Sequence, residues 1–179
     1  MQDKEMSAQE GKVYEGWNGM IGKIREMLVR HEGYRVKPYK CTQGFNTIGI
    51  GYNFDVNPLP ADIRQYLREN GRITDEMVDR LFTKSLSDAV SACVRQYPGF
   101  ALFSENRRLA LVDFMFNLGP GRVSKFRNTN MAINSGRWAD AAEGIRKSLY
   151  WKQLGGDPEG TDDGRLERPE EIYKLIKEG

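Results

Sequence analysis

A helix that ends at a glycine and leads at once into a strand pattern is the feature that most constrains this chain. Ile21, Ile24 and Leu28 recur at helical spacing and predict an apolar stripe. Gly33 is the residue type that closes helices in a left-handed conformation. Glu32 is therefore expected at the helix C-terminus, where the negative end of the helix dipole favours the protonated form of a carboxyl group. Such an acid is suited to general-acid catalysis, although a glutamate at a helix end is by itself more typical of solvated surface.

The residues after Gly33 predict a β-hairpin. Tyr34, Val36 and Tyr39 follow an alternating pattern, and residues 42–44 are typical of a turn. The run at 45–48 has the composition of a returning strand. A small β-containing lobe is therefore expected directly after the first helix.

This hairpin would bring chemically useful side chains to Glu32. Gly49 and Gly51 indicate a close backbone approach rather than a phosphate loop, because no third glycine follows at nucleotide-binding spacing. The hairpin would carry Cys41 and Thr47 back beside Glu32. An acid, a thiol and a hydroxyl are thus expected to face one cleft.

The rest of the chain predicts a third strand at 52–56 and a series of helices. Thr74 and Ser104 are residue types that cap helix N-termini. The helix after Ser104 is apolar nearly all round, which is typical of a helix at the centre of a lobe. The predicted helices cover residues 62–70, 75–97, 105–118, 128–134, 137–151 and 169–177.

Two segments, 24–33 and 39–51, resemble the phage lysozymes of glycoside hydrolase family 24. The family pattern is Glu, eight residues, Asp or Cys, five residues and Thr, and Glu32, Cys41 and Thr47 match it without a gap. The resemblance continues from about residue 21 to the C-terminus.

The resemblance implies an α+β fold that is mainly α and lysozyme-like. A small β-hairpin lobe, about 32–74, would be joined by a long helix, about 75–97, to a larger helical lobe. That helical lobe would comprise about 98–179 together with the first helix. Residues 1–19 are expected to be an N-terminal extension to a catalytic domain at 20–179.

The implied function is that of an endolysin, a muramidase that hydrolyses the β-1,4 bond between N-acetylmuramic acid and N-acetylglucosamine in peptidoglycan and so lyses the host cell. Glu32 would protonate the leaving oxygen. Cys41 and Thr47 would act at the opposite face of the sugar ring, on water or on the developing cation. The resemblance implies no metal and no cofactor.

Cys41 stands where many members of the family have aspartate. A carboxylate there could act as a base toward water or stabilise an oxocarbenium-like charge directly. A thiol, with a reference pKa of about 8.5, is mostly neutral at pH 7, and a nearby ionised Glu32 would raise that pKa. A structural role as a small buried hydrophobe is the alternative for Cys41, and Thr47 is also a common strand residue. The spacing from Glu32 favours a functional role for both.

The resemblance assigns four further residues to substrate binding. Phe116 and Asn117 would lie beneath the substrate, while Asn53 and Thr129 would contact its sugar or peptide part. Structural alternatives exist: Phe116 could be a core residue and Asn117 could close a helix.

Composition argues against several other classes. The net charge of +2 is too small to indicate nucleic-acid binding. We also expect the protein to be a monomer. Two cysteines do not make a disulfide framework, and Cys93, on the apolar stripe of its helix, is expected to be buried. His31 is the only histidine, so a helical zinc motif is incomplete. The acidic segment at 155–164 lacks EF-hand spacing and is expected to be a solvated loop.

No apolar run approaches the roughly 18 residues of a membrane span. The N-terminus lacks the apolar core of a signal peptide. We therefore expect a soluble protein, made in the host cytoplasm without stable membrane insertion, that reaches the cell wall after release or delivery.

Two other functions are compatible with the sequence. A lytic transglycosylase cleaves the same bond without water and needs only one acid. A non-catalytic cell-wall-binding or virion module would need none. The products distinguish a hydrolase from a transglycosylase, because hydrolysis leaves a reducing end and transglycosylation leaves an anhydro-sugar.

Overall fold

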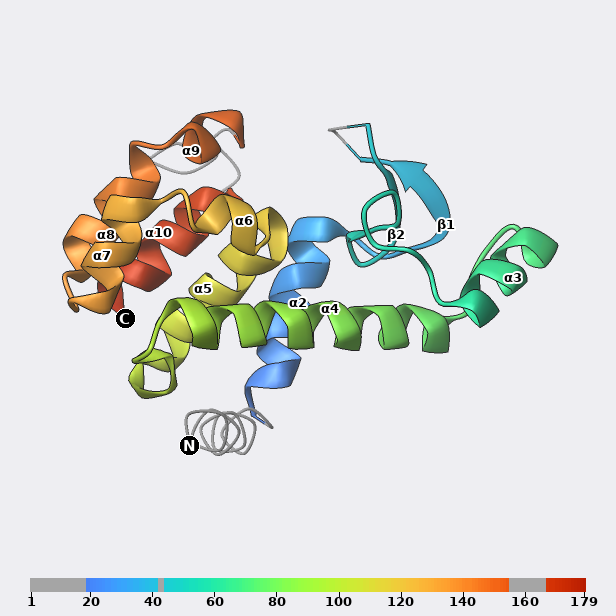
Figure 1. Ribbon diagram of the computed structural model, residues 1–179, viewed down its shortest axis with the longest axis horizontal. Helices are drawn as coiled ribbons and strands as arrows, with labels where there is room; N and C mark the ends of the chain where they lie inside the picture. Colours follow the sequence, from blue (N-terminus) through green and yellow to red (C-terminus); the bar gives the residue numbers. More distant parts are fainter. Residues whose placement is uncertain (1–18, 42–43, 155–166) are drawn as a thin grey trace. The chain divides into compact units, whose positions relative to one another are not determined.

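The computed structural model describes residues 19–41, 44–154 and 167–179, which are mainly helical with one small antiparallel sheet (Figure 1). This confirms the predicted mainly α, α+β class with its lysozyme-like architecture. The expectations for the N-terminal extension, for the turn residues 42–43 and for the acidic segment at 155–164 lie outside the described residues.

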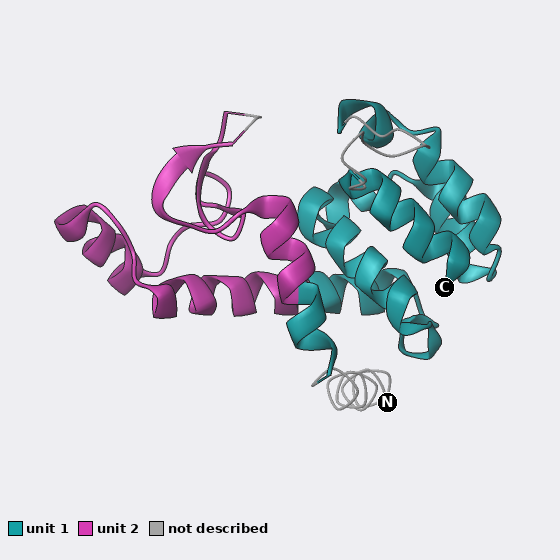
Figure 2. Ribbon diagram, turned by 180° about the vertical axis from the view of Figure 1, so that it is seen from behind, with its two compact units in different colours: residues 1–24, 89–179 teal, residues 25–88 magenta. Residues whose placement is uncertain are grey.

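The chain divides into two compact units (Figure 2). The β unit is Arg25–Asp88, and the helical unit is Ala89–Gly179 together with the residues up to Ile24. The division falls within two helices, α2 and α4. The elements up to the end of the second of these are α2 (Met20–Glu32), β1 (Arg35–Lys40), β2 (Asn46–Gly49), β3 (Tyr52–Asn53), α3 (Ala61–Asn70) and α4 (Asp75–Gln96).

Helix α2 ends as predicted. Gly33 has a φ of 78°, and its N–H donates to the carbonyl of Val29 at 2.9 Å. Ile24 and Leu28 lie on the buried face as predicted, but the prediction for Ile21 is wrong, because its side chain is 44% exposed. The buried stripe instead consists of Met20, Ile24, Met27 and Leu28. These residues follow the i, i+4, i+7, i+8 pattern from Met20, and Ile21 lies about 100° around the helix from that start.

The sheet has the order β1-β2-β3 with antiparallel pairing throughout. The third strand is shorter than the predicted 52–56. The side-chain Oδ1 of Asn53 accepts hydrogen bonds from the backbone N–H groups of Asp55 and Val56, at 3.1 and 3.2 Å. This local turn competes with strand pairing and ends β3 after two residues.

Local capping chemistry sets the bounds of α3 and α4. Gly71 closes α3 in a left-handed conformation with φ 66°. Thr74 caps α4 as predicted, because its Oγ1 accepts from the N–H of Met77 at 3.2 Å. The hydroxyl of Tyr34 donates to Asp75 at the start of α4 and so links the hairpin to that helix.

The helical unit is built around α5. Its elements after α4 are η1 (Phe100–Leu102), α5 (Glu105–Leu118), α6 (Pro120–Val123), α7 (Arg127–Asn134), α8 (Trp138–Arg146), α9 (Leu149–Gln153) and α10 (Arg168–Glu178). Ser104 caps α5 by accepting from the N–H of Arg107 at 3.3 Å, as predicted. Residues 109–115 are all buried, and α10 packs against both α5 and α8. The apolar surface around α5 therefore forms the centre of the unit.

The single helix predicted at 137–151 is wrong: the segment forms α8 and α9. The break falls at Ser148, whose hydroxyl oxygen accepts from the N–H of Trp151 at 3.3 Å and so starts a new helix. The new direction places Tyr150 edge-to-face against Phe114 of α5, with 5.1 Å between ring centroids.

Two buried polar features tie the helical unit together. Arg168, the first residue of α10, donates from Nε to Oδ1 of the fully buried Asp113 at 2.7 Å. Cys93 is buried as predicted, and its thiol donates to the carbonyl of Leu111 at 3.4 Å. Burial raises the pKa of the Cys93 thiol, so this cysteine is held in its unreactive protonated form. Among the helices of the described ranges, none is both long and apolar enough to cross a membrane.

Candidate active site

Glu32 is the last residue of α2, and its carboxyl group lies directly against the backbone of Gly51. A Cβ added at Gly51 would come within 2.8 Å of Oε2 of Glu32 and 2.9 Å of its Cδ. Gly51 also has a φ of 66°, a conformation that other residues rarely adopt. The close backbone approach predicted at Gly51 is therefore confirmed. Sequence reasoning did not identify its partner, which is the side chain of Glu32.

Cys41 follows the last residue of β1 at the tip of the hairpin. Its N–H donates to the carbonyl of Phe45 at 3.0 Å, and its own carbonyl accepts from the N–H of Gly44 at 2.8 Å. Cys41 is partly exposed, in contrast to Cys93. The hairpin closure therefore fixes the backbone that carries the Cys41 thiol.

Thr47 lies in β2 and is linked to Cys41 through a shared acceptor. Its hydroxyl donates to the carbonyl of Phe45 at 3.1 Å, the same oxygen that accepts from the N–H of Cys41. Thr47 is 3% exposed. It pairs with Tyr39 on one side and with Asn53 on the other. The structure thus brings the predicted thiol and hydroxyl to one end of the hairpin.

Tyr39 connects these groups, although sequence reasoning treated it only as a strand residue. Its hydroxyl donates to the main-chain carbonyl of Glu32 at 3.5 Å. Burial raises the pKa of the Tyr39 phenol, and the negative charges of Glu32 and of an ionised Cys41 raise it further, against an opposing effect of Arg35. Glu32 and Cys41 are therefore both within electrostatic range of one phenol. The i, i+2 spacing from Tyr39 to Cys41 was the available sequence signal, because such residues share one side of a strand.

Asn53 has a structural task in the same unit. Its Oδ1 holds the turn at Asp55 and Val56, as described above. Asp55 in turn accepts from both the backbone N–H and the side chain of Asn46, each at 2.7 Å. Asn53 lies beside Thr47, and its part in substrate binding stays a prediction.

The other three predicted substrate-binding residues belong to the helical unit. Phe116 and Asn117 occupy the last turn of α5 and are partly exposed. Thr129, in α7, is only 4% exposed, and its Oγ1 lies 2.3 Å from where a Cβ on Gly144 of α8 would be. The Thr129 hydroxyl is thus packed between two helices. The role of all three in binding stays a prediction.

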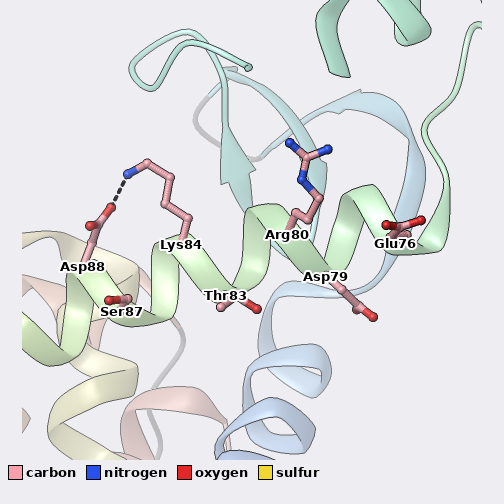
Figure 3. Close-up of a pocket in the computed structure, with 7 residues that line it drawn as sticks. All are labelled: Glu76, Asp79, Arg80, Thr83, Lys84, Ser87 and Asp88. Carbon is pink, nitrogen blue, oxygen red and sulfur yellow. Dashed lines mark hydrogen bonds and ion pairs between the residues drawn. The ribbon is translucent and has the colours of Figure 1, made fainter. Parts of the chain in front are cut away.

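A hollow of about 560 Å³, lined by polar and charged residue types, runs along α4 of the β unit (Figure 3). None of the predicted site residues lines it. Its two basic side chains form exposed ion pairs, Lys84 with Asp88 and Arg80 with Asp62, each at 2.6 Å. The lining residues are Glu76, Asp79, Arg80, Thr83, Lys84, Ser87 and Asp88, all from one helix. Within the described ranges, no three His, Cys, Asp or Glu side chains gather as a metal site would require.

Glu32 at the end of α2, packed against the backbone of Gly51 beside a short hairpin, fits a glycoside hydrolase of the lysozyme type, in which a carboxyl group acts as the acid. The model of the family described as phage lysozyme matches residues 29–166, and the chain belongs to this family. Its activity is accordingly that of a lysozyme.

Two of the chain's relatives are an endolysin and a probable lysozyme by name. The chain is 30% identical over 139 residues to the endolysin of Salmonella phage P22. The match covers 74% of this chain and 82% of the relative. It is 29% identical over 146 residues to the probable T4-type lysozyme 2 of Dictyostelium discoideum, and the match covers 73% of this chain and 86% of the relative. It is also 32% identical over 147 residues to the pre-baseplate central spike protein Gp5 of Enterobacteria phage T4. There the match covers 74% of this chain and only 26% of the spike protein.

Proposed function

We propose that the chain is a muramidase of the endolysin type. It hydrolyses the β-1,4 bond between N-acetylmuramic acid and N-acetylglucosamine in bacterial peptidoglycan and so lyses the host cell. The likeness to the P22 endolysin supports this, because it extends over most of both chains. We propose further that the chain works as a monomer on glycan strands.

The observation that carries this proposal is the placement of the Glu32 carboxyl group on Gly51, beside the hairpin that holds Cys41 and Thr47. Glu32 donates its proton to the glycosidic oxygen as the bond to C1 breaks. Water then adds to C1 from the opposite face and gives up one proton to solvent, which leaves a neutral sugar hydroxyl, and solvent returns a proton to the Glu32 carboxylate. Cys41 and Thr47 act at that face, on the water or on the developing positive charge.

The substrate-binding roles follow from the same proposal. Phe116 and Asn117 offer an apolar face and an amide from the end of α5. Asn53 and Thr129 offer polar contacts to the sugar or its peptide, although Thr129 would have to act from a largely buried position.

Mass analysis of the muropeptides released from purified peptidoglycan tests the proposed reaction. Hydrolysis predicts fragments with a reducing N-acetylmuramic acid end. Anhydro-muramic ends would show that the chain is a lytic transglycosylase and not a hydrolase. An intact glycan, from protein shown by circular dichroism to be folded, would indicate a non-catalytic binding module instead.

Cys41 gives a second, independent test. A thiol reagent should label the partly exposed Cys41 before the buried Cys93 and should stop lysis, because the adduct fills the position of water or sugar. Cys41→Asp should keep activity, since it installs the residue that is commoner in the family. Cys41→Ser should be slower, because a serine hydroxyl does not ionise near neutral pH.

Peptide mass spectrometry locates the label, and turbidity loss of chloroform-treated Gram-negative cells reports lysis. The Cys41→Asp protein is the matched control, because the reagent should leave it active. If Cys41→Ala lyses cells as fast as the unaltered protein, the thiol is a bystander.

A further inference from the structure

We infer that Tyr39 is a positioning residue, which holds the main chain of Glu32 at a fixed place relative to the hairpin of Cys41 and Thr47. This inference rests on the proposed catalytic roles of those three residues. It adds a fourth side chain that does not itself touch the reacting atoms.

The first support is the hydrogen bond from the Tyr39 hydroxyl to the carbonyl of Glu32. The last four carbonyls of a helix lack partners within the helix, and Glu32 is the last residue of α2. The phenol therefore supplies a partner where the helix cannot. At 3.5 Å the bond is at the upper limit for a hydrogen bond, so its contribution to stability is small.

The second support is the way the Tyr39 ring is held. The Arg35 guanidinium lies over the ring, 4.6 Å from its centroid. On the next strand, Tyr39 pairs directly with Thr47, and Arg35 pairs with Gly49. The register between these two pairs shifts, which marks an irregularity in β1. The ring is thus fixed from its own strand while its hydroxyl reaches α2.

The third support is electrostatic. Because burial and the charges of Glu32 and Cys41 raise the pKa of the Tyr39 phenol, the hydroxyl keeps its proton below that pKa. It therefore remains a donor throughout the pH range in which carboxyl groups and thiols ordinarily titrate. The hydrogen bond from the Tyr39 hydroxyl to the carbonyl of Glu32 is therefore kept when the catalytic groups change charge.

Contacts from Gly51 and Tyr39 then act on different parts of Glu32. Gly51 limits where the carboxyl group can lie, and Tyr39 fixes the main chain from which that carboxyl group extends. Loss of the Tyr39 hydroxyl should leave substrate binding intact and reduce the fraction of complexes in which the acid is aligned.

The test is Tyr39→Phe, which keeps the ring and its contact with Arg35 but removes the hydroxyl. We expect kcat on peptidoglycan to fall about tenfold, within the roughly 100-fold that a 1 Å misplacement can cause, with KM unchanged. Tyr34→Phe is the matched control, because Tyr34 bonds to Asp75 at the start of α4 rather than to α2. It should keep the kcat of the unaltered protein.

A double-mutant cycle separates positioning from a general structural role. In a Glu32→Gln background there is no acid to align, so adding Tyr39→Phe should cause no further loss. Equal losses in both backgrounds, or a loss that follows a lowered unfolding midpoint, would overturn the inference. So would an unchanged kcat for Tyr39→Phe when Glu32→Gln is inactive, and that outcome leaves the proposed function standing. An unaltered protein that leaves the glycan intact would overturn both.

Discussion

Replacing Glu32 with glutamine lowers the rate of peptidoglycan hydrolysis by about 10²–10⁴-fold, the usual contribution of a general acid. This corresponds to about 3–5 kcal/mol of activation free energy. Glutamine keeps the size and the polar character of the side chain, so it can still lie against Gly51. It has no acidic proton to donate to the glycosidic oxygen. The release of reducing ends measures the rate, and circular dichroism shows that the fold is retained.

Glu26→Gln is the matched control, because Glu26 is an exposed glutamate on the same helix. It should retain the activity of the unaltered protein. Activity of the Glu32→Gln protein within about threefold of the unaltered rate would remove Glu32 from the role of general acid, since the expected loss is at least about 10²-fold.

Gly51→Ala has the second largest expected effect. The new methyl group would come 2.8 Å from Oε2 of Glu32, so the carboxyl group or the backbone must move. Alanine at a φ of 66° adds a backbone cost of about 1–2 kcal/mol. Because a shift of about 1 Å in a reacting group can cost about 100-fold, we expect kcat to fall by about that factor.

Gly49→Ala separates these two effects. Gly49 has nearly the same φ, 67°, but a Cβ there would meet Val78 at an ordinary distance of 3.5 Å. Both variants should lose similar stability in urea unfolding, whereas only Gly51→Ala should lose most of its kcat. Equal loss of kcat in the two proteins would show that backbone strain, and not contact with Glu32, is responsible.

Elements that depend on neighbours in sequence could be predicted closely. Gly33 and Gly71 close helices, and Thr74 and Ser104 open them, as their chemistry indicates. In each case the deciding contact joins residues three or four positions apart, so the necessary information lies within one turn of helix.

Predictions were less accurate where tertiary packing decides which face of a helix is buried or where a helix ends. Ile21 has the same apolar character as Ile24, but only Ile24 faces the core. The segment at 137–151 has enough helical character for one helix. Two helices form instead, because the hydroxyl of Ser148 caps a new helix and Tyr150 packs against Phe114.

The sequence by itself determined the mainly α class, the helix-to-hairpin transition and the spacing of Glu32, Cys41 and Thr47. These follow from periodicity, from glycine and from a motif that is continuous along the chain. Only the tertiary structure decided that Gly51 touches the Glu32 carboxyl group and that Tyr39 reaches its main chain. Both contacts join residues brought together by the antiparallel return of the strands. Their distances depend on sheet register and on the angle between helix and sheet, which no local pattern of residue types specifies.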